Sequence, residues 1–162
     1  MIALAASKVI LLSSLSIIFY QDIKYRAVWW FLFPAFLVSA GFLYFLNSPV
    51  EIMLLNFGLN LLVLTLILSI SFLYARFKMK VLFFKEAFGI GDLFFFLGLT
   101  VAFPTLSFIV ILVFCLIFSL ILHLFLAHNS QQTVPLAGYA SFFLILVYLS
   151  NWFLFYNNIY TY

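Results

Sequence analysis

Hydrophobic residues occur along this chain in long runs separated by short polar segments. The runs cover roughly residues 2–20, 28–46, 53–75, 92–103, 106–127 and 136–156. Most of them approach the ~20 apolar residues that an α-helix needs to cross a bilayer. The pattern therefore predicts an all-α integral membrane protein, a single domain over residues 1–162 built as a bundle of about six transmembrane helices.

The fourth run, 92–103, is shorter than the others. About a dozen residues cannot cross a hydrocarbon core of ~30 Å as a straight helix. Because unpaired backbone groups are costly in lipid, the ends of such a helix must be shielded by protein or open into a water-accessible recess. We expect a short fourth helix with Asp92 at its start.

The composition supports the membrane class. The 162 residues are 69% hydrophobic and only 7% charged, far from the roughly 25% charged residues of soluble domains. The net charge of +3 comes from basic residues in short loops, so it indicates no nucleic-acid partner. The single cysteine, Cys115, lies in the middle of a run, which excludes an intramolecular disulfide and a cysteine-based zinc site. We expect no metal and no cofactor.

Basic residues are distributed unevenly between the loops, which predicts an orientation. The first and third loops hold six of the seven: Lys24, Arg26, Arg76, Lys78, Lys80 and Lys85. The second and fourth loops hold none. The positive-inside rule then places the odd-numbered loops in the cytoplasm and both termini outside. Lys8, in the first run, is the exception, and its long stem can reach the outer interface.

Two of the four acidic residues lie at the ends of apolar runs. Glu51 and Glu86 fall in loops, where both can reach water. Asp22 follows the first run and Asp92 opens the fourth. Since the runs alternate in direction, both aspartates fall at the cytoplasmic end of the bundle. We expect their carboxylates to come within hydrogen-bonding reach.

Two close carboxylates in a partly desolvated site titrate as a coupled pair that shares one proton. An aspartic protease needs this arrangement. One carboxylate takes a proton from the attacking water while the other, protonated, polarises the scissile carbonyl and later supplies a proton to the leaving amine. No metal or nucleophilic side chain is required.

A purely structural interpretation fits the same residues. Asp92 is a good N-cap for the fourth helix, and Asp22 can mark a helix end beside Lys24 and Arg26. Gly89 and Gly91 either form a tight turn or let backbone approach the carboxylates and an extended substrate. Other polar residues in the runs have plain roles. We expect Asn56 and Asn60 to bond between helices, His123 and His128 to lie near the interface, and Ser13, Ser14 and Ser16 to serve packing.

Three segments of the chain resemble a known family. In order and spacing, "QDIKYRAVWW", "KEAFGIGD" and "QQTVPLAGYA" resemble the motif regions of type IV prepilin peptidases, the prokaryotic branch of the GxGD intramembrane aspartyl proteases. The resemblance covers nearly the whole chain. It implies that Asp22 and Asp92 are the catalytic aspartates and that Gly89 and Gly91 are the motif glycines.

The resemblance also marks residues that shape the site, and some positions depart from it. Pro135 matches the proline that opens the last helix, and Lys24, Arg26 and Glu86 occupy charged positions of the motifs. The family usually has a lysine where Phe95 stands, and an Ile-Pro-Asn where this chain has Val28, Trp29 and Trp30. The cysteine-rich segment of the long, methylating members is absent. We therefore expect the short, peptidase-only form without a methyl donor.

The implied substrate is a type IV prepilin or pseudopilin precursor, with a basic leader, a glycine before the cut and an apolar helix after it. The implied location is the prokaryotic cytoplasmic (inner) membrane, with the active site facing the cytoplasm and lipid around the spans. A bundle this apolar is compatible with self-association and with packing against lipid alone. The rival interpretation is a non-catalytic assembly factor or a small ion or proton carrier, for which Phe95 is the best support.

Overall fold

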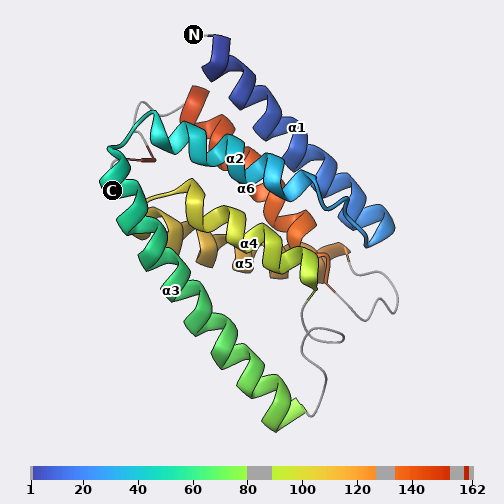
Figure 1. Cartoon of the computed structure of the whole chain (residues 1–162). Coiled ribbons are helices and arrows are strands. Elements are labelled where there is room, and N and C mark those ends of the chain that lie inside the picture. Colours follow the sequence, from blue (N-terminus) through green and yellow to red (C-terminus); the bar gives the residue numbers. More distant parts are fainter. Residues whose placement is uncertain (1, 80–88, 127–133, 154–158, 161–162) are drawn as a thin grey trace.

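The computed structural model describes residues 2–79, 89–126, 134–153 and 159–160. All regular structure in these residues is helical, as Figure 1 shows. The helices are α1 (Ile2–Tyr25), α2 (Leu32–Phe45), α3 (Val50–Tyr74) with a π-helical turn over Ala75–Met79, α4 (Ile90–Ala102), α5 (Thr105–Leu126) and α6 (Leu136–Phe153). The all-α class predicted from the apolar runs is confirmed.

Helix length divides the described helices into two groups. By length and composition, α1, α3, α5 and α6 can each cross a membrane. By contrast, α2 has 14 residues and α4 has 13, so each is about 20 Å long at a rise of 1.5 Å per residue. The short fourth helix is as predicted, whereas a short second helix is not.

The connection between α1 and α2 explains why the second helix is short. The first helix continues through Tyr25, a turn beyond the predicted end, so Asp22 lies inside it. It ends at Arg26, whose φ of 54° is left-handed. Residues 27–29 then leave the helical conformation, although they are as apolar as the helix that follows. Hydrophobicity alone does not distinguish such a connection from helix.

The bundle is held together by one core. Helix α1 packs against α2 and α6, α2 also packs against α4, and α3 packs against α4 and α5. All six helices contribute buried apolar side chains to a single cluster. Gly98 brings α4 close to α2, because a Cβ there would lie 2.5 Å from a ring carbon of Phe36.

Helix α3 is the most peripheral. Only Asn60 and Leu64 are buried along its length, and most of its other leucine and isoleucine side chains are exposed. In Figure 1 its C-terminal half diverges from the other helices. Such apolar exposure suits contact with lipid tails rather than water.

A buried asparagine on α3 closes the C-terminal end of α4. That helix ends at Ala102, since Phe103 precedes Pro104 and adopts an extended conformation, as a residue before proline prefers. The last carbonyls of a helix lack partners within it. Asn60, fully buried, donates through Nδ2 to the carbonyl oxygens of Thr100 and Phe103, both at 2.9 Å.

Asn56 serves the start of the next helix in the same way. Its Oδ1 accepts a hydrogen bond from the Thr105 hydroxyl at 2.8 Å, and its Nδ2 donates to Tyr44 Oη at 2.8 Å. The two asparagines therefore bond between helices, as expected. Ser13, Ser14 and Ser16 donate to carbonyls of their own helix.

Candidate active site

Asp22 and Asp92 come together at the N-terminus of α6. Asp22 lies in the last turn of α1 and Asp92 in the first turn of α4. Asp22 Oδ2 accepts a hydrogen bond from the Gly138 N–H at 2.6 Å, and Asp92 Oδ1 accepts one from the Ala137 N–H at 2.8 Å. Because these N–H groups belong to consecutive residues, the two carboxylates lie side by side.

The N-terminus of α6 is suited to bind two carboxylates because of its unpaired N–H groups. The first N–H groups of a helix have no partner within it and carry the positive end of the helix dipole. Pro135, buried directly before α6, opens that helix. Two carboxylates that would otherwise repel each other are thereby each given a donor.

The structural interpretation of Asp92 as an N-cap is wrong. Gly89 occupies the N-cap position of α4, and Asp92 lies three residues later. Its Oδ1 bonds to α6, 45 residues further along the chain. The carboxylate therefore joins two helices, which a local cap does not require.

Two glycines allow the carboxylates to sit this close to backbone. A Cβ on Gly138 would lie 3.0 Å from Asp22 Oδ2, and one on Gly89 would lie 3.0 Å from Asp92 Oδ2. A Cβ on Gly91 would meet Phe33 at 3.5 Å, an ordinary contact. Gly138 did not stand out in the sequence. Its one signal is its place three residues after Pro135.

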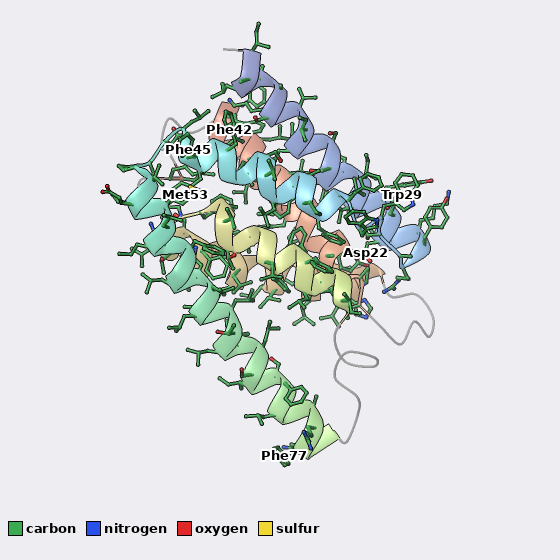
Figure 2. All side chains as sticks on the ribbon, in the orientation of Figure 1. Asp22, Trp29, Phe42, Phe45, Met53 and Phe77 are labelled. Atoms are coloured by element: carbon green, nitrogen blue, oxygen red, sulfur yellow. The ribbon has the colours of Figure 1, made fainter. Side chains whose placement is uncertain are left out.

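Both carboxylates line a pocket of about 320 Å³, a size typical of ligand sites. The lining includes the connection from Arg26 to Val28 with Trp30, and Gly89 to Gly91. Phe33 and Phe94, stacked with ring centroids 6.0 Å apart, contribute an apolar wall. Figure 2 shows Asp22 and Trp29 at one end of the bundle and Phe45 and Met53 at the other.

Gln21 holds the α1–α2 connection beside the pocket. This side chain is buried, and its Oε1 accepts a hydrogen bond from the Trp29 N–H at 3.0 Å. Sequence reasoning overlooked Gln21. The available signal was a polar amide directly before Asp22, at the end of an apolar run.

The charged residues suggested by the resemblance differ in where they lie relative to the pocket. Arg26 lines the pocket. Lys24 does not: it is exposed, donates to Tyr20 Oη at 2.7 Å and lies over the ring of Tyr25. Glu86 lies outside the described residues.

No protein-family model matches the chain, and neither a curated protein nor a solved structure matches it. The chemistry of the site therefore has to be argued from its own geometry. Within the described ranges, no group of three or more histidine, cysteine or acidic side chains gathers in a way that could hold a metal ion. His123 lies half-buried in the last turn of α5, and His128 falls outside those ranges.

Phe95, which stands where the resemblance implies a lysine, belongs to the core. It is fully buried, and its ring stacks on Phe36 with centroids 5.4 Å apart and planes inclined by 15°. It does not line the pocket, although it follows Asp92 by one helical turn. At this position the chain therefore has a packing contact between α2 and α4.

Proposed function

We propose that this chain is a membrane aspartic endopeptidase of the type IV prepilin peptidase family, which removes the basic leader from prepilin or pseudopilin precursors at the cytoplasmic face. One observation carries the proposal. Two aspartates from separate helices are held side by side by the Ala137 and Gly138 N–H groups, at the edge of a pocket.

The geometry is suited to acid and base catalysis. One oxygen of each carboxylate is engaged by α6, and Asp92 also accepts a hydrogen bond from the Gly89 N–H, which fixes the orientation of both groups beside the pocket. A water between the two carboxylates loses a proton to the ionised one as it attacks the scissile carbonyl, which the protonated partner polarises. The tetrahedral intermediate then collapses, and the leaving amine takes up a proton from the pair.

The short helices favour a site that water can reach. Helices α2 and α4 fall about 10 Å short of a ~30 Å hydrocarbon core, and both begin at the pocket, with Phe33 and Gly89 in its lining. Shielded by the longer helices, they leave space for a recess at the cytoplasmic interface. In this placement all six helices are spans or shielded part-spans, and both termini face outward.

The proposed substrate matches the pocket's surroundings. A peptide bond must be extended to be attacked, and the junction between a polar leader and an apolar helix is the segment of a precursor that is easily unwound. Trp29, Trp30 and Ile90 are 60%, 76% and 59% exposed beside the pocket. Large aromatic side chains of this kind suit a membrane interface, where such a junction lies.

The alternative is a non-catalytic assembly factor or ion carrier, for which Phe95 in place of lysine is the best support. Phe95 packs in the core against Phe36 and does not line the pocket. A carrier also needs polar groups available along a path through the spans. Asn56 and Asn60, the central amides of α3, are engaged in bonds between helices.

Cleavage of tagged prepilins in liposomes tests the proposal. The variants are Asp22→Asn and Asp92→Asn, because an amide oxygen can still accept the α6 N–H bond and the fold should persist. Glu51→Gln is the matched control, since Glu51 is an exposed carboxylate at the start of α3. Loss of the acid or base function is expected to lower kcat by at least about 10²–10⁴-fold.

Each outcome is decisive when folding is followed by size-exclusion profile and thermal unfolding. If the native chain cuts after the leader and only the two aspartate variants fail, the carboxylate pair is catalytic. If either variant cuts like the native chain, the pair is not the catalytic centre. If the folded native chain cuts none of a panel of prepilins and pseudopilins, the peptidase proposal is wrong and the assembly-factor alternative takes its place.

A further inference from the structure

Arg26 adopts a backbone conformation that disfavours its own side chain. Its φ is 54°, and among the described residues no other non-glycine residue has a positive φ. Its N–H donates to the Asp22 carbonyl at 3.2 Å, which ends α1. Glycine is the usual residue at this position of a helix, because a Cβ is strained in the left-handed region. Glycine would relieve the backbone strain at this position, so the presence of an arginine side chain needs a separate explanation.

The side chain of Arg26 lies where that explanation can be found. It lines the pocket with both aspartates and is close enough to interact electrostatically with each carboxylate. The Ala137 and Gly138 N–H groups are already bonded to the carboxylates. In the described lining of the pocket, Arg26 and Trp30 supply the side-chain donors, and of these only Arg26 is charged.

The chemistry of the pocket limits what Arg26 can bind. A guanidinium has five N–H donors and no acceptor, so it can keep a partner within the chain and still donate to a ligand. Two carboxylates in the same pocket disfavour an anionic ligand, and a basic leader would be repelled by the guanidinium. A main-chain carbonyl oxygen, which every extended peptide offers, is the acceptor that fits.

We propose that Arg26 is a substrate-binding residue, whose guanidinium donates to a main-chain carbonyl oxygen next to the scissile bond and aligns that bond with Asp22 and Asp92. This assignment rests on the proposed peptidase function. It also distinguishes Arg26 from Lys24, two residues earlier, whose ammonium group is held by Tyr20 and Tyr25 outside the pocket.

Steady-state cleavage of a tagged prepilin by Arg26→Gly, Arg26→Gln and Arg26→Lys tests the assignment, with Lys24→Gln as the matched control. Loss of a charge-assisted hydrogen bond is expected to lower kcat/KM about 10- to 100-fold in the glycine and glutamine variants. Lysine keeps the charge but not the planar fork, so it should recover part of the loss. Lys24→Gln should stay within about twofold of native, since an exposed charge contributes little.

The glycine variant separates a binding role from a structural one. Glycine suits the φ of 54°, so Arg26→Gly should purify and unfold thermally like the native chain. If it does so and loses kcat/KM, the side chain binds substrate. If it keeps native kcat/KM, Arg26 only ends α1 and the assignment is wrong. Should it fold poorly, the difference between Arg26→Lys and Arg26→Gln, which both retain a Cβ, decides in the same way.

Three further outcomes contradict the assignment for different reasons. If Lys24→Gln loses as much activity as Arg26→Gln, basic charge acts generally, through lipid headgroups rather than through a substrate carbonyl. If the folded native chain cuts none of the precursors, the peptidase function fails and the Arg26 assignment fails with it. Native cleavage that needs both aspartates but tolerates Arg26→Gln would overturn the Arg26 assignment alone.

Discussion

The two ends of the helix bundle both place polar side chains among apolar ones, and they use different chemical groups to do so. At one end, Asp22 and Asp92 accept N–H bonds from α6 and line a pocket of about 320 Å³. At the other, Asn60 is fully buried and bonds the last carbonyls of α4. The first end keeps a route for a ligand, whereas the second is closed by packing.

The difference follows from charge. An amide is neutral, so burying it between helices costs less than burying a charge, even though Asn60 Oδ1 has no hydrogen-bond partner. A carboxylate within a membrane bundle is expensive, and carboxylates found there generally face a cavity and serve function. Comparing the two ends shows that a polar residue in an apolar chain points to chemistry when it is ionisable and borders open space.

Phe95→Lys should have the largest effect on stability, because it places a charged side chain in the closed core. The substitution removes the stacking on Phe36 and buries an ammonium group, which should destabilise the fold by about 3–5 kcal/mol. The checks are purified yield and thermal unfolding in detergent. Phe94→Lys is the matched control, since Phe94 is 47% exposed and borders the pocket. A Phe95→Lys variant as stable as Phe94→Lys would contradict the packing described for α4.

Gly138→Ala should damage the site without damaging the fold. The added Cβ would lie 3.0 Å from Asp22 Oδ2 and 3.1 Å from Asp22 Cβ, so the carboxylate has to move away from α6. Displacement of a catalytic group by ~1 Å can cost about 100-fold, so we expect a 10- to 100-fold lower kcat for prepilin cleavage. Helix stability should not fall, because alanine is the better helix former.

Gly58→Ala provides the control for that substitution. Gly58 lies in α3, and a Cβ there would meet no atom within 4 Å. Its kcat should equal the native value. Equal rates for Gly138→Ala and the native chain would mean that Asp22 does not need its close approach to α6.

Asn60→Leu should have the smallest effect, and on stability rather than chemistry. It leaves the carbonyls of Thr100 and Phe103 without the amide donor that now bonds both at 2.9 Å. Hydrogen bonds between membrane helices are worth about 1–2 kcal/mol, so the midpoint of thermal unfolding should fall by about 2–8 °C. For protein that remains folded, kcat should be unchanged. If Asn60→Leu lost much of its kcat while its stability was unchanged, this prediction would be wrong, and the two ends of the bundle would be functionally coupled.

Several features of this protein could be predicted from the sequence because they depend on local composition. The apolar runs predicted the helices, and the length of run 92–103 predicted a short α4, since hydrophobicity adds up along a segment. Asp22 and Asp92 stood out because acids are rare in so apolar a chain. The runs failed at residues 28–31, which are apolar yet lie outside helix because Gln21 bonds Trp29 and Arg26 ends α1.

The tertiary structure alone decided how these residues meet. The bond from Gly138 to Asp22 joins residues 116 positions apart, and no local pattern specifies which N–H reaches which carboxylate. Packing also placed Arg26 at the pocket and Lys24 outside it, and placed Phe95 in the core one turn from Asp92. Sequence thus determined which groups are available for chemistry, while contacts between distant segments determined which of them face the same space.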